Sequence, residues 1–180
     1  ITVKWLDKLP DLQAFSLTVN PGSPIVGQSS TFVVGIKNIG TDTATGPFDV
    51  DFYVHGSKIG TKTVRSLSMG RVTYQSYSKT VTSGAGPHKV KVVVNESKTP
   101  KELGYANNTI EKTFNWGNVP KPDLVVSLMT TVPYSPVVGR STTITAVIKN
   151  QGSKGIGAGV PAFYVRFFIN GKQVDQQSKY

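Results

Sequence analysis

The sequence predicts an all-β protein built from two copies of one module, the second of them incomplete. Apolar residues rich in Val, Ile, Phe and Tyr recur at alternate positions between Gly- and Pro-containing breaks, which is the pattern of strands with one buried face. The stretch that begins at Pro10 also recurs from Pro122, and 15 of the 31 aligned positions are identical. Because the identities include turn residues as well as apolar positions, we interpret them as a duplicated structural unit.

The first copy divides into seven short segments of strand character. Turn residues such as Pro21-Gly22 and Gly46-Pro47 separate them. The expected strands cover residues 11–19, 29–37, 48–55, 58–65, 71–81, 88–95 and 108–116. About seven strands in about 100 residues favour an immunoglobulin-like β-sandwich. The fold class is therefore tandem immunoglobulin-like β-sandwiches.

The third strand can be given an inward face from the repeat itself. Its alternate apolar residues remain apolar in the second copy, where the counterparts of Phe48, Val50, Phe52 and Val54 are Phe163, Val165, Phe167 and Ile169. Agreement at every second position is expected for the buried face of a strand. The intervening Asp49 and Asp51 are expected to be solvated charges, since two carboxylates are too few ligands for Ca²⁺.

The repeat also sets the expected domain boundaries. Residues 10–117 form a complete module and residues 118–121 form a linker. Residues 122–180 correspond to the first three strands and the start of the fourth strand of a second module. Two alternatives stay open for this incomplete copy: the chain is a fragment of a longer array, or it is a subunit completed by another copy.

Residues 1–9 are expected to form an N-terminal strand and linker. Thr2-Val3-Lys4-Trp5 is similar to Thr113-Phe114-Asn115-Trp116, which ends the first module. Residues 1–9 would then contain the last strand of a preceding copy. Ile1, Val3 and Trp5 are candidates for an inter-copy donor strand, which pairs with the open sheet of a neighbouring subunit.

Composition excludes several kinds of chemistry. The chain has no cysteine, so it has no disulfide, thiolate metal site or cysteine nucleophile. His55 and His88 are its only histidines, and we interpret them as a turn residue and a residue at the start of a strand. No Gly-x-Ser-x-Gly motif occurs. We therefore expect no catalytic, cofactor-binding or metal site, and no enzymatic activity.

The net charge of +10 is spread along the chain rather than concentrated in a basic run. Such a field favours anionic partners, here an anionic glycan or a cell-wall polymer, without specific recognition of nucleic acid. No apolar run is long enough to insert into a membrane. A set of aromatic and basic residues could form a surface for polysaccharide, although pairing across strands explains them better. The set consists of Tyr53, Tyr74, Tyr77, Tyr105, Lys58, Lys62, Arg71 and Lys79.

Two sequence motifs suit a secreted, glycosylated protein. Asn95-Glu96-Ser97 and Asn107-Asn108-Thr109 match the N-glycosylation pattern. Asn95 and Asn107 are therefore the candidate modification sites.

The order of several short motifs resembles the CARDB family, the cell-adhesion-related domain found in bacteria. These motifs are Pro10-Asp11-Leu12, Pro-x-x-Gly from Pro24, Lys-Asn-x-Gly from Lys37, Gly86-Pro87-His88 before a Val-rich strand, and the sequence ELGYANN from Glu102. The resemblance implies a non-catalytic, immunoglobulin-like repeat module of secreted and surface-anchored proteins. The resemblance also implies that relatives often carry an acidic residue where this chain has Asn95 and another near Tyr105, so a cation contact made by those acids is not expected here.

These observations lead to three hypotheses for function. The first is an extracellular or cell-surface module with a structural or adhesive role, as stalk, spacer or adhesion domain, whose partners are neighbouring copies of the module. The second is a subunit of an extracellular filament assembled by strand complementation between copies. The third is an accessory binding domain of a secreted hydrolase.

Overall fold

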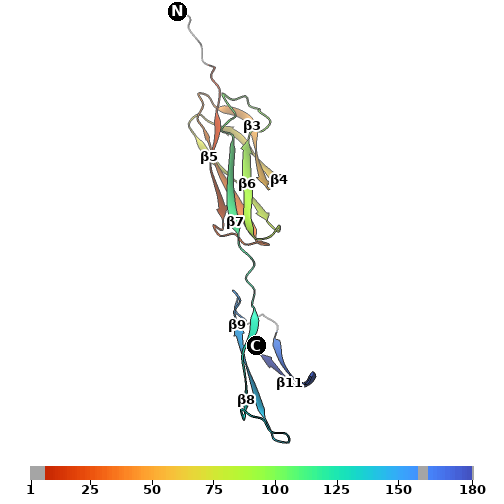
Figure 1. The fold of residues 1–180 in the computed structure, drawn as a ribbon. Coiled ribbons are helices and arrows are strands. Elements are labelled where there is room, and N and C mark those ends of the chain that lie inside the picture. The colour runs from red at the N-terminus through yellow and green to blue at the C-terminus, as the bar shows by residue number, and fades with distance from the viewer. Residues whose placement is uncertain (1–6, 158–161, 180) are drawn as a thin grey trace, which may run out of the picture. The chain divides into compact units, whose positions relative to one another are not determined.

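The computed structural model describes residues 7–157 and 162–179. The chain divides into two compact units, residues 1–119 and 120–180 (Figure 1). Within the described ranges every regular element is a β-strand, and no helix there is long and apolar enough to cross a membrane. The Ile1, Val3 and Trp5 donor-strand prediction lies outside the described residues.

The first unit is a sandwich of a three-stranded and a four-stranded antiparallel sheet. The strand orders are β1-β2-β5 and β4-β3-β6-β7. Its strands are β1 (Leu12–Asn20), β2 (Ser29–Asn38), β3 (Ala44–Val54), β4 (Ser57–Leu67), β5 (Val72–Thr80), β6 (Gly86–Val94) and β7 (Thr109–Trp116). The predicted all-β, immunoglobulin-like fold is confirmed.

The core of the first unit lies between these two sheets. Its largest fully buried apolar side chains come from β1, β2, β3 and β6, and they are Leu12, Phe32, Val34, Ile36, Phe48, Val50, Phe52, Val90, Val92 and Val94. The alternate apolar residues of β3 all belong to this core, so the predicted inward face of that strand is correct.

The prediction that Asp51 is a solvated charge is wrong. Asp51 is only 4% exposed, and its carboxylate lies 2.7 Å from Lys58 Nζ and accepts a hydrogen bond of 2.6 Å from Thr61 Oγ1. Thr61 is the direct cross-strand partner of Asp51, so β4 places both groups over the carboxylate. Asp49 is exposed and accepts a hydrogen bond of 2.7 Å from Thr63 Oγ1.

Asn38 explains why the Lys-Asn-x-Gly motif follows the second strand. Its side chain is 0% exposed and makes four hydrogen bonds to backbone groups. Oδ1 accepts from the N–H groups of Asp11 and Gly40, each at 3.1 Å. Nδ2 donates to the carbonyl groups of Asp42 at 2.8 Å and Leu67 at 2.9 Å. One amide therefore joins the start of β1, the turn after β2 and the end of β4.

The glycine of the same motif allows two backbone segments to pass closely. A Cβ on Gly40 would overlap backbone atoms of Leu9, Pro10 and Asp11. Gly152 meets the equivalent backbone of Lys121 to Asp123. Any larger residue would push the Pro-Asp-Leu segment away, so the two motifs are parts of one contact.

The second unit contains two separate antiparallel strand pairs. They are β8 (Leu124–Val132) with β9 (Thr143–Asn150), and β10 (Phe163–Ile169) with β11 (Lys172–Lys179). The register irregularity of β1, between Ala14 and Ser16, recurs at the equivalent place in β8, between Val126 and Leu128. The repeat therefore extends to the irregularities of the strands.

The two units differ in burial. None of the described residues of the second unit is buried. Leu124 is 37% exposed and Val126 is 63% exposed, whereas their counterparts Leu12 and Ala14 are 0% and 9% exposed. In the first unit β1 packs against β6 and β7 of the opposite sheet, which cover these positions. The described part of the second unit has no equivalent of these strands.

Candidate functional site

A buried carboxylate fixes the loop between β6 and β7. Glu102 Oε2 accepts a hydrogen bond of 2.5 Å from the backbone N–H of Leu12. Its Oε1 accepts from Asn95 Nδ2 at 2.6 Å and from Asn108 Nδ2 at 2.8 Å. Leu12 begins β1, whereas Asn95 and Asn108 flank the loop, so Glu102 ties this loop to the other sheet.

Burial raises the pKa of the Glu102 carboxyl group above its usual value of 4.5. The hydrogen bonds from Asn95, Leu12 and Asn108 oppose this increase, while the nearby charge of Asp11 adds to it. All the polar partners of the carboxylate are thus supplied by fixed groups of the fold. The arrangement is suited to holding a loop in place.

The two candidate glycosylation sites lie next to this network. Asn95 is buried, and its Nδ2 also donates to the carbonyl of Pro100 at 2.7 Å. Asn107 is partly buried, and its Nδ2 donates to Asp11 Oδ1 at 2.9 Å. A glycan attached to either nitrogen would displace these contacts. Modification of Asn95 and Asn107 stays a prediction.

The tyrosines of the predicted aromatic and basic set are divided between two sheets and a loop. Tyr77 on β5 stacks on Phe52 with ring centroids 5.8 Å apart and belongs to the edge of the core. Tyr74, also on β5, packs edge-on against Phe15 at 6.2 Å. Tyr105 lies in the loop between β6 and β7. These contacts favour the sheet-stabilising interpretation for Tyr74 and Tyr77.

Tyr53 on β3 has the most polar surroundings of this set. Its hydroxyl donates a hydrogen bond of 2.7 Å to Glu96 Oε2, and Lys91 Nζ lies 4.5 Å from the ring centroid. The hydrogen bond to Glu96 is the main reason that the pKa of Tyr53 rises to about 12. Lys58 on the adjacent strand has its pKa raised by the hydrogen bond to Asp51. This outer face of the four-stranded sheet therefore carries alternating positive and negative groups.

The two histidines meet at one end of the first unit. His55 Nε2 lies 2.8 Å from His88 Nδ1, and the ring centroids are 4.7 Å apart. His55 and Gly56 form the turn between β3 and β4 with φ angles of 50° and 79°, as a two-residue hairpin turn requires. A backbone hydrogen bond of 3.0 Å from the His55 N–H to the Lys89 carbonyl holds this turn against β6.

His88 is buried at 3% exposure, and its position is fixed on three sides. Its Nε2 lies 2.8 Å from the carbonyl oxygen of Gly84, so Nε2 carries a proton and donates it to that oxygen. With Nε2 as the donor, Nδ1 faces His55 Nε2 as the acceptor. Trp116 packs against the ring with centroids 4.9 Å apart, and Ser83 Oγ lies 3.4 Å from Nδ1.

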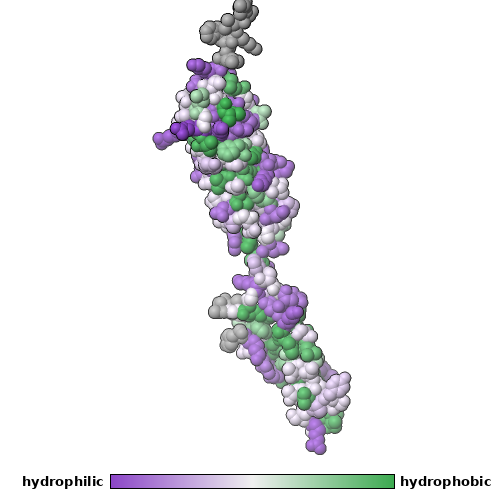
Figure 2. Space-filling view, turned by 90° about the vertical axis from the view of Figure 1, so that its left-hand side faces the viewer, coloured by the Kyte–Doolittle hydropathy of each residue, from purple (hydrophilic) through white to green (hydrophobic). Residues whose placement is uncertain are grey.

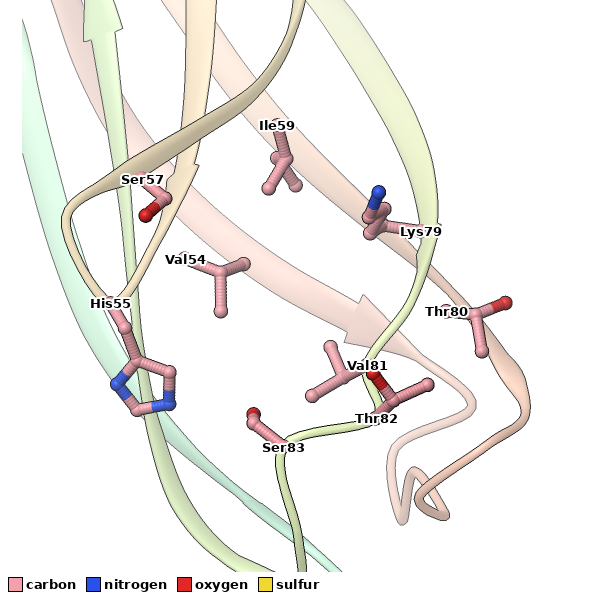
Figure 3. A pocket seen from close by; sticks show the side chains of 9 residues that line it. All are labelled: Val54, His55, Ser57, Ile59, Lys79, Thr80, Val81, Thr82 and Ser83. Carbon is pink, nitrogen blue, oxygen red and sulfur yellow. The ribbon is translucent and has the colours of Figure 1, made fainter.

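A cavity of about 270 Å³ opens beside His55. His55 and Ser83 lie at one end of the cavity, and Val54, Ile59 and Val81 contribute apolar side chains (Figure 3). The cavity thus gives solvent access to the exposed His55. Among the described residues no group of three or more His, Cys, Asp or Glu side chains is placed to hold a metal ion.

Sequence reasoning did not find the histidine pair or the Glu102 network. The two histidines are 33 residues apart, and only the pairing of β3 with β6, in which Val54 is opposite Val90, brings them together. In the sequence, each histidine adjoins an apolar strand. This position predicts a contact between the two histidines only when the pairing of β3 with β6 is known.

Comparison with known proteins identifies the module. The CARDB family model matches residues 9–112 and again residues 121–178. A CARDB domain from Pyrococcus furiosus, solved in complex with di-metal ions, superimposes with a TM-score of 0.51 at 24% identity, over 63% of this chain and 97% of that chain. A domain of a putative cell surface protein from Methanosarcina acetivorans gives a TM-score of 0.53 at 26% identity, over 61% and 93%. A search of curated proteins found no significant match. The two matches of the family model cover most of the sequence, and the chain therefore belongs to the CARDB family.

Proposed function

We propose that this chain is a non-catalytic repeat module of an extracellular or cell-surface protein, with a structural or adhesive role. The observation that carries the proposal is the duplication of one module, which the family model matches twice. The similar domain from Methanosarcina acetivorans comes from a putative cell surface protein. A repeated module is suited to extending a surface protein, since every further copy adds its own length to the chain.

Two hydrogen-bond networks of the first unit support a structural role as a spacer. Asn38 connects β1, β2 and β4, and Glu102 connects β1 to the loop before β7. Both networks lie at the ends of strands, where local unfolding of a sandwich begins. Because the links run between strands distant in sequence, they resist local opening of the sandwich.

Surface labelling of intact cells of the source organism tests the location. Antibodies against the purified chain are expected to label intact cells, or to detect the protein in the medium, as strongly as they label permeabilised cells. An antibody against a cytoplasmic protein serves as the control for membrane integrity. Labelling that requires permeabilisation would overturn the proposed location.

An adhesive role predicts binding to anionic polymers. The net charge of +10 should favour retention on an acidic polysaccharide over a neutral one, and added salt should weaken it. Affinity chromatography on the two matrices at several salt concentrations measures this difference. Equal retention on both matrices would contradict the adhesive role, whereas the spacer role would be unaffected.

Assembly by strand complementation is a second candidate function. None of the described residues of the second unit is buried, which supports this candidate. Figure 2 shows hydrophobic residues at the surface of that unit. In the first unit β2 pairs with β5 and β3 pairs with β6, whereas the equivalent strands β9 and β10 each have one partner strand. A strand added beside β10, in the place that β6 has beside β3, would cover Leu124 and Val126.

The proposed donor is the segment that contains Ile1, Val3 and Trp5 in another copy of the chain. The full chain should then form concentration-dependent oligomers, and a variant that begins at Pro10 should be monomeric. Size-exclusion chromatography with light scattering measures both. A second variant carries Ile1→Ser, Val3→Ser and Trp5→Ser in the full-length chain. It shows whether assembly depends on the apolar side chains or only on the presence of the segment. Monomeric full chain, or oligomers that persist unchanged in both variants, would overturn this candidate.

A further inference from the structure

The pair of histidines at the end of the first unit has the geometry of a metal-binding site. Two imidazole nitrogens, His55 Nε2 and His88 Nδ1, face each other at 2.8 Å. Two nitrogens that each lie about 2.0–2.1 Å from one ion are about 2.9–3.4 Å apart, depending on the coordination angle. A small rotation of the exposed His55 ring is enough to reach this separation.

His88 is already oriented as a ligand. Its Nε2–H donates to the Gly84 carbonyl at 2.8 Å, which leaves Nδ1 with a free lone pair. Metal-binding histidines usually donate their second ring N–H to such an acceptor, because the hydrogen bond fixes the tautomer and the ring orientation. Trp116 holds one side of the ring at a centroid distance of 4.9 Å. The hydrogen bond to Gly84 and the contact with Trp116 therefore hold the buried ring with Nδ1 towards His55.

We propose that His55 Nε2 and His88 Nδ1 bind a divalent transition-metal ion of the Zn²⁺, Ni²⁺ or Cu²⁺ class. Imidazole is a preferred ligand of these ions. The Ser83 hydroxyl, 3.4 Å from His88 Nδ1, is placed to contribute an oxygen. Water in the adjoining cavity of about 270 Å³ completes the coordination (Figure 3). The ion would replace the hydrogen bond between the rings, and the proton on His55 Nε2 would pass to Nδ1 of the same His55 ring.

The site would act as a removable link between two elements. His55 belongs to the turn between β3 and β4, whereas His88 belongs to β6. An ion held by both rings binds the folded unit and not the unfolded chain, so it stabilises the fold by mass action. Lys79 lines the same cavity and opposes a cation, which favours moderate rather than very tight affinity.

The second unit provides a conservative test variant. Asn170-Gly171 occupies the turn equivalent to His55-Gly56, and Asn170 has a φ of 49°, close to the 50° of His55. Asn is among the residues that adopt this left-handed conformation readily. The change His55→Asn therefore removes the imidazole while keeping the turn. Thr82→Ala, which alters another residue of the same cavity, is the matched control.

The experiment is a titration of the untagged full chain with Zn²⁺ by isothermal calorimetry, with thermal unfolding recorded in the same buffer. We expect one ion per chain, a higher melting temperature with Zn²⁺, and weaker binding on acidification because protons compete for the imidazoles. His55→Asn should weaken Zn²⁺ binding at least about tenfold, since even loss of an outer partner has such an effect. Thr82→Ala should bind as the unchanged chain does.

A second readout identifies the ligand atoms. In nitrogen NMR spectra of the histidine rings, Zn²⁺ should shift His55 Nε2 and His88 Nδ1 and leave the proton on His88 Nε2. Circular dichroism should show that His55→Asn is folded. Absence of Zn²⁺ binding, binding that His55→Asn leaves unchanged, or ring spectra that do not respond would each overturn the proposal.

Discussion

Replacing Asn38 by alanine tests whether one buried amide holds together the strand ends of the first unit. The change removes four hydrogen bonds to backbone groups of Asp11, Gly40, Asp42 and Leu67. A typical hydrogen bond contributes about 0.5–1.5 kcal/mol net, so four bonds amount to about 2–4 kcal/mol after water reaches some of the freed groups. Domain stabilities are about 5–15 kcal/mol, so this is a large fraction of the total.

The assay is urea unfolding of the full chain followed by tryptophan fluorescence. Trp116 is buried in the core of the first unit, so its emission reports the unfolding of that unit. Asn38→Ala should lower the midpoint without changing the slope m, because the surface exposed on unfolding is nearly the same. The free energy of unfolding then falls in proportion to the midpoint.

Asn150 supplies the matched control within the same chain. It makes the equivalent bonds to Asp123 N–H at 3.0 Å, Gly152 N–H at 3.0 Å and the Lys154 carbonyl at 2.7 Å, in more exposed surroundings. Asn150→Ala should leave the Trp116 transition unchanged. A loss below about 0.5 kcal/mol in Asn38→Ala, the range of ordinary surface substitutions, would refute the clamp interpretation.

Three further predictions follow from the first unit. Gly40→Ala should destabilise it by about 1–3 kcal/mol in the same urea assay, because the new Cβ overlaps fixed backbone, and an unchanged midpoint would contradict the close approach. The phenol of Tyr53 should titrate with a pKa of about 12 by ultraviolet absorbance, and Glu96→Gln should move it towards 10.0. Folding raises the pKa of Glu102, so ionisation of this carboxyl group at higher pH lowers the free energy of unfolding. Acidification from neutral pH towards 4.5 should therefore increase the free energy of unfolding. Glu102→Gln should lack this part of the pH dependence of the urea midpoint, and identical pH profiles would argue against the raised pKa.

The strands of the first unit were predictable from sequence because their signals are local. Alternation of Phe48, Val50 and Phe52 reports a buried face, and Gly and Pro residues report the breaks between strands. The repeat strengthened the assignments of the first three strands by presenting the same pattern twice. Strand order and register, which no local pattern specifies, came only from the structure.

The polar sites were not predictable for the same physical reason. Asp51 has the sequence pattern of an outward charge, yet Lys58 and Thr61 on the neighbouring strand cover it. The His55–His88 pair depends on which strand lies beside β3, and Glu102 depends on a contact with Leu12, 90 residues away. Side chains of this kind acquire their environment from partners in space, so their spacing in sequence carries little information.

The Asn-x-Gly motif shows which features of this module need only two paired strands and which need the remaining strands of the sandwich. Asn150 forms its hydrogen bonds in the second unit, although none of the described residues there is buried. The turn, the close approach at Gly152 and the irregularity of β8 all lie within the β8–β9 pair. These features therefore need only the pair itself, whereas burial of Leu124 and Val126 needs further strands. The contacts of the Asn-x-Gly motif are thus a property of the first two strands and do not depend on a buried core.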